Sequence, residues 1–424
     1  MNNYQLSIKN YQFYKDSGVE WLGDVPEHWE CGMLNRIARR VVVGIAEAAT
    51  HAYAEKGIPI LRSTNIRAGK IIGDIFYVNS DFANERKSKL IKAGDLVTVR
   101  TGNVGVTAVL PEELDGCQCF TMLITTLTKL SSTSYYCYWM NSVSAQGYFY
   151  LEGWGTAQVN ISVPILQALP IPIPPLNEQK LIANYLDTKT AQCDRKIDLL
   201  TQKATQYGKL KQSLINETVT RGLDKSVPMK DSGVEWIGDI PKHWKIQRLK
   251  NLSQIKTGGK DTINSVEDGK YPFFVRSQTI ERINSYSFDG EAILTAGDGV
   301  GVGKVFHYVN EKFDYHQRVY KISHFRGLDG KFLFYYMRNH FYKEAFRLNA
   351  KATVDSLRMP MFQNFPVVFG CKEEQKAIAD YLDTKTAQID QIIQTINTQI
   401  EKLKELRKTL INDVVTGKIK VIDN

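Results

Sequence analysis

The sequence contains one stretch twice: EQKLIANYLDTKTAQCD at residues 178–194 returns as EQKAIADYLDTKTAQID at residues 374–390. Of the 17 positions, 14 are identical, and the two copies continue in step to Thr220 and Thr416. The second copy contains neither Gly nor Pro, and the first contains only Gly208. Uninterrupted sequence of this kind predicts one long helix per copy, roughly 65 Å at about 1.5 Å per residue.

The ends of the two helices carry capping signals. Asn177 is predicted to cap the first helix, because a side-chain oxygen at that position can accept from the first free N–H groups. Gly222 and Gly417 are predicted to end the two helices, since Gly adopts the left-handed conformation that follows a last turn.

Apolar residues recur in both copies on alternating four- and three-residue steps, the 3.5-residue period typical of a coiled-coil seam. The two helices are therefore predicted to pack against each other. Lys211 and Arg407 interrupt the period at equivalent positions. The residues predicted to pair the helices are Ile197, Leu200, Tyr207, Leu214, Ile389, Ile393, Ile396, Ile400, Leu403 and Leu410.

A second repeat precedes each domain, as KDSGVEWLGDVPEHWE at residues 15–30 and KDSGVEWIGDIPKHWK at residues 230–245, with 12 of 16 positions identical. We expect its tryptophans to seat a domain on the helices rather than to stack on bases, because an apolar Trp gains most when buried. These are Trp21, Trp29, Trp236 and Trp244. No carboxylate or nucleophile recurs beside His28 and His243 at the spacing of a catalytic triad, so packing is favoured for them too.

The sequence between the repeats has the pattern of a mixed α/β domain in each half. In the first half, residues 58–66 and 95–110 predict strands with tight turns, and residues 135–151 predict a helix. The second half repeats this order in residues 271–280, 292–306 and 331–346. It has about 19 fewer residues between its first strand and its Gly-rich turn. The predicted fold class is α+β: two α/β domains joined by two long coiled-coil helices in an internal repeat.

The junctions at residues 155–179 and 351–375 set the boundaries, because their prolines force an extended path before each helix. The predicted segments follow the chain in order. They are residues 1–175 for the first domain with its N-terminal arm, 176–222 for the first helix, 223–229 for a linker, 230–372 for the second domain, and 373–424 for the second helix and tail.

Composition narrows the functional class. The net charge of +9 and the pI near 9.0 suit a polyanionic partner such as nucleic acid. Six cysteines lack paired zinc-ligand spacing, and Cys117 with Cys119 is expected to lie on one strand face rather than in a metal site. No apolar run reaches the length of a membrane span, and the N-terminus lacks a signal-peptide core, so a cytoplasmic protein with reduced thiols is expected.

The chain resembles the specificity subunit of type I restriction-modification systems over essentially its whole length. Four features carry the resemblance: both VEW(L/I)GD(V/I)PxHW motifs, both EQKxIAxYLDTKTAQxD helices, the TAQVNIS junction at residues 156–162, and the duplicated order. At the second junction ATVDSLR, residues 352–358, replaces TAQVNIS.

This resemblance implies two target-recognition domains, each reading one half of a split double-stranded DNA site. It implies that the helices pack antiparallel as a spacer, with the N-terminal arm near the end of the second helix. The expected partners are two methyltransferase subunits and, for cleavage, restriction subunits. Adenine methylation would take place on the methyltransferase subunits, which would bind S-adenosylmethionine. No catalytic residue, cofactor or metal is expected on this chain, and no membrane contact.

Polar and basic side chains in tight turns can contact phosphates and base edges, independently of any resemblance. The Arg-Ser pair and the Gly-rich turn occur at equivalent places in both domains. In the first domain the candidate DNA-binding residues are Arg62, Ser63, Asn65, Arg100, Thr101, Asn103, Gln158 and Asn160. In the second they are Arg276, Ser277, Gln278, Lys304, Gln317, Arg318, Lys351 and Thr353.

Two other classes of protein remain as alternatives. A self-contained DNA methyltransferase or nuclease would use the turn GDGVGVGK, residues 297–304, as a cofactor loop, but the turn lacks the acidic ribose ligand of a dinucleotide fold. The only Pro-Pro, in Ile-Pro-Pro-Leu at residues 173–176, is not an adenine methyltransferase motif, and P-loop and nuclease carboxylate motifs are missing. A coiled-coil scaffold without a DNA role is disfavoured by two large and divergent domains.

Overall fold

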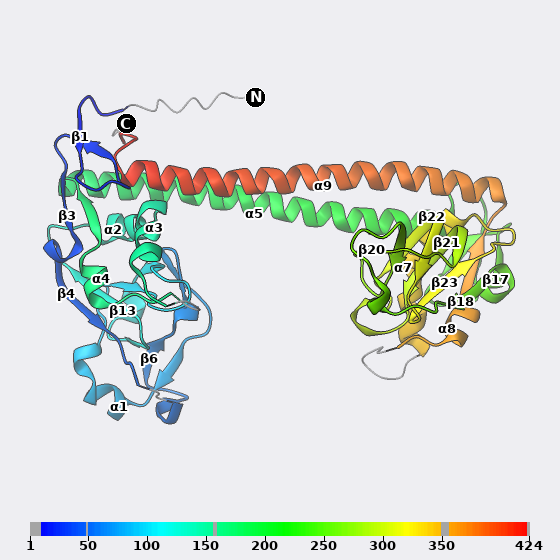
Figure 1. Ribbon diagram of the computed structural model, residues 1–424, viewed down its shortest axis with the longest axis horizontal. Helices are drawn as coiled ribbons and strands as arrows, with labels where there is room; N and C mark the ends of the chain where they lie inside the picture. Colours follow the sequence, from blue (N-terminus) through cyan, green and yellow to red (C-terminus); the bar gives the residue numbers. More distant parts are fainter. Residues whose placement is uncertain (1–9, 48–49, 156–158, 349–355, 422–424) are drawn as a thin grey trace. The chain divides into compact units, whose positions relative to one another are not determined.

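The structure, a computed structural model, describes residues 10–47, 50–155, 159–348 and 356–421 (Figure 1). It divides the chain into two compact units: Met1–Leu199 with Thr398–Asn424 (unit 1), and Leu200–Asn397 (unit 2). Each unit holds one α/β domain together with parts of the long helices α5 (Leu176–Arg221) and α9 (Lys372–Val415).

Unit 1 is built around a four-stranded antiparallel sheet in the order β11-β10-β13-β4. Its side chains alternate between two cores. Leu96 and Leu123 face the long helices, whereas Val97 and Ile124 face a smaller sheet of order β12-β6-β9-β5. The strands are β4 (Ala38–Val43), β5 (Tyr53–Ala54), β6 (Ile58–Leu61), β9 (Phe76–Val78), β10 (Leu96–Thr98), β11 (Thr107–Val109), β12 (Gln118–Cys119) and β13 (Leu123–Leu127).

Shorter elements complete unit 1. The strands β1 (Tyr14–Asp16) with β2 (Asp24–Pro26), β7 (Ile66–Arg67) with β8 (Lys70–Ile71), and β3 (Glu30–Met33) with β14 (Pro170–Ile173) form two-stranded antiparallel sheets. The short helices are α1 (Ser80–Glu85), α2 (Thr133–Met140), α3 (Val143–Glu152) and α4 (Val163–Gln167). Cys117 and Cys119 are buried in the core between the two sheets, as expected for one strand face.

The single helix predicted over residues 135–151 is wrong, because the structure breaks it into α2 and α3. Asn141 ends α2: its Nδ2 donates to the backbone O of Thr107 (2.8 Å), and its Oδ1 accepts from the Thr107 N–H (3.1 Å). Ser142 then caps α3 by accepting from the N–H of Ala145 (3.2 Å). In unit 2 the equivalent prediction is confirmed, since α7 (Gly330–Leu348) is continuous.

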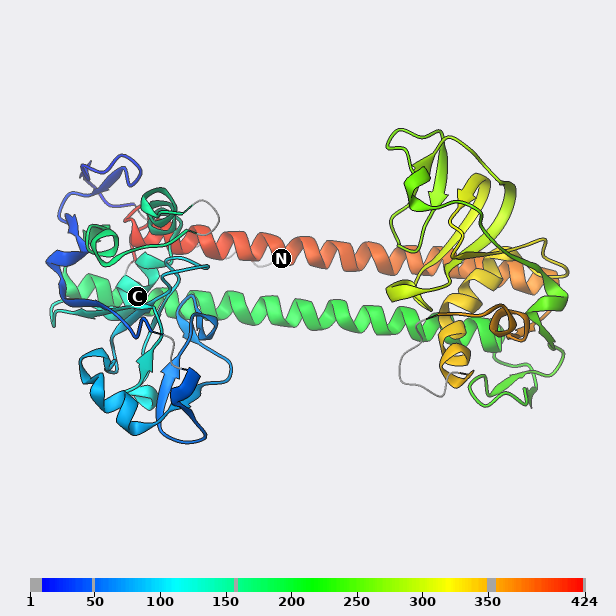
Figure 2. The ribbon, with the colours of Figure 1, turned by 60° about the horizontal axis from the view of Figure 1, so that its bottom comes forward.

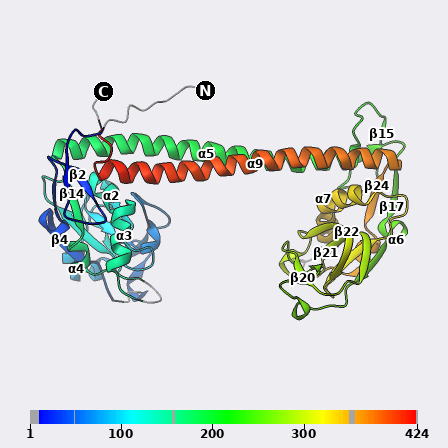
Figure 3. The same cartoon turned by 45° about the horizontal axis from the view of Figure 1, so that its top comes forward.

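Unit 2 contains a six-stranded sheet in the order β18-β23-β21-β22-β19-β20, antiparallel except between β19 and β22. Helix α7 lies between this sheet and the long helices (Figure 3), because one core joins Ile293 of β21, Phe332 of α7 and Ile378 of α9. The strands are β18 (Gln254–Thr257), β19 (Tyr271–Phe274), β20 (Glu281–Ile283), β21 (Phe288–Ala296), β22 (Phe306–Tyr315) and β23 (Val319–Ser323).

The remaining elements of unit 2 parallel those of unit 1. The hairpin β15 (Met229–Asp231) with β16 (Asp239–Pro241) corresponds to β1–β2, and β17 (Lys245–Arg248) with β24 (Pro366–Phe369) corresponds to β3–β14. The short helices are α6 (Leu249–Leu252) and α8 (Met359–Gln363). The predicted α+β class with a duplicated domain is confirmed.

The long helices end as predicted, but the residue predicted to cap the first one is wrong. Gly222 and Gly417 have φ values of 76° and 78°, and their N–H groups bond to Thr218 and Val414. The predicted cap Asn177 is wrong: α5 begins at Leu176, directly after Pro175, whose carbonyl accepts from Gln179 N. Helix α5 has 46 residues and α9 has 44.

Within each unit the two helix segments lie side by side and antiparallel (Figure 2). In unit 1, Ile182 and Val414 share a core, and farther along Arg407 Nε lies 2.9 Å from Asp194 Oδ1. In unit 2, residues 215 and 378 share a core, and Lys211 Nζ lies 2.6 Å from Asp390 Oδ2. The two charged residues that interrupt the seam are thus paired across it, at equivalent positions of the repeat. All ten predicted pairing residues are buried or half-buried.

The second repeat seats each domain on the helices, as predicted. Trp29 and Trp244 are at most 1% exposed and pack in cores with residues of both α5 and α9. His28 Nε2 lies 2.9 Å from Glu178 Oε2, and His243 Nε2 lies 3.0 Å from Glu374 Oε1. The other two tryptophans, Trp21 and Trp236, stack on Trp139 and Phe365.

A buried glutamine joins the start of each long helix to its domain. Gln179 accepts from the Ser132 N–H (2.8 Å), the residue that caps α2, and donates to Pro174 O (2.8 Å). Gln375 likewise accepts from the N–H of Asp329 (2.8 Å), just before α7. Eight residues farther along each helix, Tyr138 donates to Asp187 (2.7 Å) and Tyr335 to Asp383 (2.8 Å). The repeated helix motif therefore supplies the contacts that dock the domains.

The described part of the N-terminal arm, from Asn10 onward, lies near the end of the second helix, as expected. The Tyr14 hydroxyl donates to the carbonyl of Gly417 (3.3 Å), and the Tyr11 hydroxyl bonds to Glu178. Both contacts fall within unit 1.

The seam predicts the effect of a buried charge. Ile396 is 5% exposed, so Ile396→Asp should lower the free energy of unfolding by about 3 kcal/mol, because the new carboxylate has no partner in an apolar seam. The neighbouring Thr395→Asp places the same residue on the exposed face and should change stability by less than about 0.5 kcal/mol. Hydrogen exchange along α9 measures both; equal losses would contradict a buried seam.

Candidate nucleic-acid interface

Each domain presents a Gly-rich turn between two antiparallel strands. Residues 99–106 join β10 to β11, and residues 297–305 join β21 to β22. A dinucleotide-binding loop needs a helix directly after it, whose N-terminus faces the phosphates. Residues 297–304 contain only a short 3-10 helix (Gly299–Gly301) and lead into β22, so they lack this arrangement.

The junction before each long helix runs beside this turn. In unit 1 the N–H of Ile161 donates to the carbonyl of Arg100 (3.1 Å), and in unit 2 the N–H of Leu357 donates to that of Gly297 (2.7 Å). Isolated bridges link Thr101 with Asn160 and Asp298 with Ser356. The two domains thus build the same backbone frame, in which turn and junction form one surface.

In unit 2 this surface gathers candidates that lie far apart in the sequence. Arg276 Nη1 lies 3.0 Å from Asp298 Oδ1, and Arg318 Nη1 lies 2.5 Å from Asp298 Oδ2. Burial acts to raise the pKa of Asp298, but hydrogen bonds from Arg318 and Arg276 outweigh it, so the pKa lies below its usual value. One ionised carboxylate therefore holds two arginines at the surface.

The other candidates of unit 2 are exposed around this group. Gln278 Nε2 donates to the carbonyl of Lys304 (3.1 Å). This bond joins the loop that contains Arg276 and Ser277 to the Gly-rich turn. Gln317 Nε2 donates to Asp261 Oδ2 (2.7 Å). The side chains of Ser277 and Lys304 are exposed as well. The structure thus brings six sequence-predicted candidates of the second domain into one connected surface, comprising Arg276, Ser277, Gln278, Lys304, Gln317 and Arg318.

In unit 1 the equivalent surface has different chemistry. The Thr101 hydroxyl donates to Asn160 Oδ1 (2.5 Å), and Arg100 Nε donates to the carbonyl of Ile161 (3.2 Å). Asn103 is exposed in the turn. The Arg62 guanidinium packs over the ring of Phe76, 3.8 Å from its centroid.

Asn65 does not fit a DNA contact. It is 2% exposed, and its amide bonds to three backbone groups: the N–H of Arg62 (3.0 Å) and the carbonyls of Ile72 (2.9 Å) and Asp74 (3.1 Å). Its neighbour Ser63 is exposed. Three other candidates, Gln158, Lys351 and Thr353, lie outside the described residues.

Sequence reasoning missed the two acids that organise the surface of unit 2, Asp298 and Asp261. Asp298 lies inside the quoted turn, but its partners are 22 and 20 residues away, so periodicity gives no sign of the contact. Unit 1 also presents Trp154, 56% exposed and bridged to Asn160.

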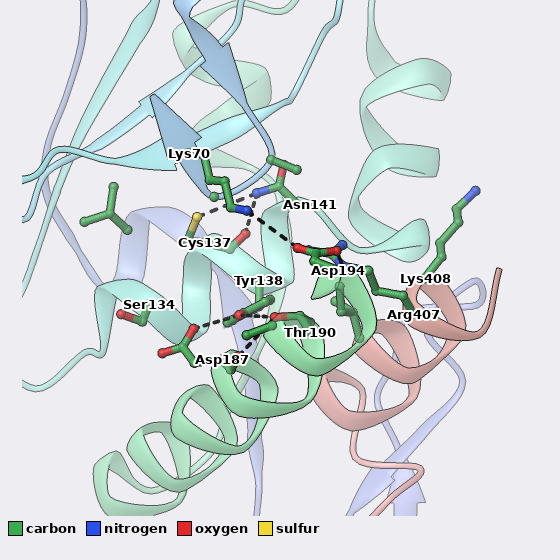
Figure 4. A pocket seen from close by; sticks show the side chains of 15 residues that line it. Lys70, Ser134, Cys137, Tyr138, Asn141, Asp187, Thr190, Asp194, Arg407 and Lys408 are labelled. Atoms are coloured by element: carbon green, nitrogen blue, oxygen red, sulfur yellow. Dashed lines mark hydrogen bonds and ion pairs between the residues drawn. The ribbon is translucent and has the colours of Figure 1, made fainter. Parts of the chain in front are cut away.

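A pocket of about 400 Å³ opens in unit 1 where the β7–β8 hairpin meets α2, α5 and α9 (Figure 4). Asp194 is its charged centre, 3.5 Å from Lys70 Nζ and 2.9 Å from Arg407 Nε. Burial raises the pKa of the Cys137 thiol to about 12, so it is a poor nucleophile at neutral pH. The pocket has the contacts of a joint between domain and spacer, and its lining pairs no activated nucleophile with a base.

In the described part of the chain, no helix is both long and apolar enough to cross a bilayer. The same residues contain no group of three His, Cys, Asp or Glu side chains arranged to hold a metal ion.

Two segments, residues 48–206 and 241–402, match the family described as the type I restriction modification DNA specificity domain. The chain belongs to this family. The resemblance drawn from the duplicated motifs is therefore confirmed, and each matched segment includes most of one α/β domain with part of the helix that follows it.

The chain is similar to specificity subunits of type I restriction enzymes. The specificity subunit of the type I restriction enzyme MjaVIII from Methanocaldococcus jannaschii is 24% identical over 441 residues, 97% of this chain and 98% of the relative. The EcoDI specificity subunit from Escherichia coli is 29% identical over 182 residues, which cover 43% of this chain and 40% of the relative.

Solved structures show the same fold. A chain solved in work on complex assembly and conformational transition of the type I R-M system matches with a TM-score of 0.74 at 16% identity, covering 92% of this chain and 98% of that one. The HsdS subunit from Thermoanaerobacter tengcongensis matches with a TM-score of 0.55 at 16% identity, covering 93% and 98%.

The sheet of the second specificity domain buries a lysine. Lys321, on β23 close to Arg318, is 5% exposed, and its Nζ lies 3.3 Å from the centroid of the Phe288 ring. Burial, followed by the charge of Lys256 on the adjacent strand, lowers the pKa of Lys321 to about 8. The folded state therefore disfavours the charged lysine at neutral pH.

This burial predicts a pH-dependent gain of stability in Lys321→Met. At pH 7 the free energy of unfolding of the variant should be about 1–2 kcal/mol higher than that of the wild type. The reason is that the cost of desolvating the Lys321 ammonium exceeds the stabilisation from its cation–π contact. Between the folded pKa of about 8 and the unfolded value near 10.5, only the unfolded lysine keeps its proton. The stability of the wild type therefore rises with pH in this range, and the advantage of the variant becomes smaller. Hydrogen exchange of β21 and β23 at pH 7 and pH 10 measures this.

The exposed Lys312, on the neighbouring strand β22, provides the control. Lys312→Met should change the stability of the sheet by less than about 0.5 kcal/mol at either pH. A loss of stability in Lys321→Met at pH 7 would contradict a buried lysine whose charge destabilises the folded state.

Proposed function

We propose that this chain is the DNA-specificity subunit of a type I restriction-modification complex, in which each domain reads one half of a bipartite, asymmetric DNA site. The main support is that both domains have the same backbone arrangement of turn and junction, but with different side chains on it. The frame of turn and junction recurs in both domains, but unit 1 presents Thr101 and Asn160 where unit 2 presents Asp298 with two arginines.

The chemistry of these surfaces suits base recognition. Arginine pairs with guanine O6 and N7, and asparagine with adenine N6 and N7, in the major groove. The exposed Lys304 suits a phosphate, and the net charge of +9 favours association with a polyanion. Two surfaces of unlike chemistry would read unlike half-sites, so the full target would not be a palindrome.

Catalysis would belong to partner subunits. Two methyltransferase subunits carrying S-adenosylmethionine would methylate adenine, and restriction subunits would cleave unmethylated DNA. Two copies would match the internal repeat, which presents the specificity domain twice. A non-catalytic role is supported by the lining of the unit 1 pocket, where the Cys137 thiol stays protonated.

A DNA selection tests this function. The full-length chain, with and without its methyltransferase subunit, is incubated with random-sequence double-stranded DNA, and the bound molecules are sequenced. Two short base clusters of different sequence, separated by a constant gap, are expected. Methyl transfer by the chain alone would favour a self-contained methyltransferase, and a lack of DNA binding with any partner would favour a scaffold.

If the helices set the spacing of the two half-sites, the number of base pairs between them should change with helix length. Seven residues inserted after Gln202 in α5, together with seven after Thr398 in α9, add one heptad to both helices and keep the phase of the seam. Each helix becomes about 10 Å longer, close to three base pairs at roughly 3.4 Å each. The selected gap should therefore lengthen by about three base pairs while the bases of both half-sites stay the same.

The single-helix insertion is the control for this measurement. In the native chain 17 residues separate Asp194 from Lys211 on α5, and 17 separate Asp390 from Arg407 on α9. Seven residues added to α5 alone make these intervals unequal, so binding to the native target should fall. An unchanged gap in the doubly lengthened chain would show that the helices do not measure the DNA.

A further inference from the structure

Asp298 is the least exposed member of the charged group on the surface of unit 2. Its side chain is 16% exposed, against 44% for Arg276 and 61% for Arg318. The carboxylate therefore lies beneath the two guanidinium groups, which face outward. Each carboxylate oxygen contacts one Nη1, at 3.0 Å for Arg276 and 2.5 Å for Arg318.

The backbone around Asp298 is held from several sides. The N–H of Gly297 donates to the carbonyl of Arg318 (2.8 Å), and the carbonyl of Gly297 accepts from the N–H of Leu357 (2.7 Å). A Cβ on Gly301 would lie 2.5 Å from the carbonyl of Arg276, so glycine lets the turn pack directly on the Arg276 loop. The carboxylate is thereby fixed in place before any ligand binds.

The arrangement leaves most of each guanidinium available. Within the described residues, only Nη1 of either side chain makes a hydrogen bond, so Nε and Nη2 of both remain for a ligand. The carboxylate also reduces the local charge from two positive charges to one. That reduction weakens attraction to phosphate, which depends on charge, but keeps the directional donors that a neutral base requires.

We propose that Asp298 is a positioning residue that holds Arg276 and Arg318 ready to read guanine in the half-site bound by unit 2. The inference rests on the proposed DNA-recognition function and specifies which base unit 2 recognises. Guanine is the base whose O6 and N7 acceptors match two parallel N–H donors of arginine. Unit 1 has a hydroxyl–amide pair, Thr101 with Asn160, at the equivalent place, so the expected guanine belongs to one half-site only.

Selection from random-sequence double-stranded DNA, with the full-length chain, tests the role of Asp298. The wild type should select guanine at a fixed position of one half-site. Asp298→Asn, which keeps the shape but removes the charge, should reduce the preference for that guanine over other bases by roughly tenfold. The other half-site should stay the same, which shows in the same measurement that the variant is folded.

The control is Asp289→Asn, which removes an exposed carboxylate from β21, loosely paired with Lys312 at 3.9 Å. It should leave both half-sites unchanged. If Asp298→Asn strengthens binding to all sequences equally and keeps every base preference, then Asp298 only lowers the charge of the surface, and the proposal is overturned.

A chemical substitution in the DNA identifies the contact. Each guanine of the half-site is replaced in turn by 7-deazaguanine, which lacks the N7 acceptor. Wild-type affinity should fall roughly tenfold at one guanine. Either Arg276→Lys or Arg318→Lys, which keeps the charge but loses the two-donor fork, should bind more weakly and no longer respond to that replacement.

The outcomes separate this inference from the proposed function. A wild-type chain that selects no bipartite site refutes both. A wild-type chain that selects a bipartite site, but whose base preferences survive Asp298→Asn or whose arginine variants both still respond to 7-deazaguanine, refutes the role of Asp298 and leaves the function standing.

Discussion

The position of each domain depends on the register in which α5 and α9 pair. Isoleucine and leucine side chains of the seam provide the stabilisation, since apolar burial is insensitive to small shifts along the helices. The charged pairs select the register. After a one-heptad shift, Lys211 and Arg407 would lie opposite Asn397 and Thr201 or, in the other direction, opposite Asp383 and Asp187, the acids that hold Tyr335 and Tyr138. These pairs are partly exposed, so each adds at most about 1 kcal/mol of stability, and their effect is on specificity of pairing.

The register matters because the same helices dock the domains. In the first copy of the repeated motif, Glu178 and Gln179 hold the domain at the start of the helix, Asp187 holds Tyr138, and Asp194 pairs across the seam. One 17-residue motif thus fixes a domain to its own helix and that helix to the other. This double use explains in physical terms why the internal repeat is so similar there while the domains themselves diverge.

Local patterns made much of this predictable from sequence. The 3.5-residue period, the absence of Pro and the repeated motif predict two long paired helices, and Gly222 and Gly417 predict their ends, since each signal lies within a few residues of the structure it determines. The cap of α5 escaped prediction because a polar and a proline signal lie close together: Pro175 precedes the first helical residue, and Asn177 lies inside the helix.

Features that depend on distant contacts could not be predicted. Asn141 breaks the helix predicted over residues 135–151 because it bonds to Thr107, 34 residues away. Asn65 looks like an exposed turn residue, but the carbonyls of Ile72 and Asp74 turn its amide inward. The pairing of Arg276 and Arg318 through Asp298 has the same origin, because the sheet brings three loops together. Polar side chains in turns can therefore be named from sequence, but their direction cannot.

The two surfaces show how one fold can carry two specificities. Backbone hydrogen bonds hold turn and junction together in both domains, from Ile161 to Arg100 and from Leu357 to Gly297. Side chains on this frame, such as Thr101 and Asp298, make contacts that differ between the two domains, whereas the backbone bonds are common to both. The frame also ends at the start of a long helix in each unit, where Gln179 and Gln375 connect it to the spacer. The chemistry of recognition can consequently change in one domain while the docking contacts and the seam remain as they are.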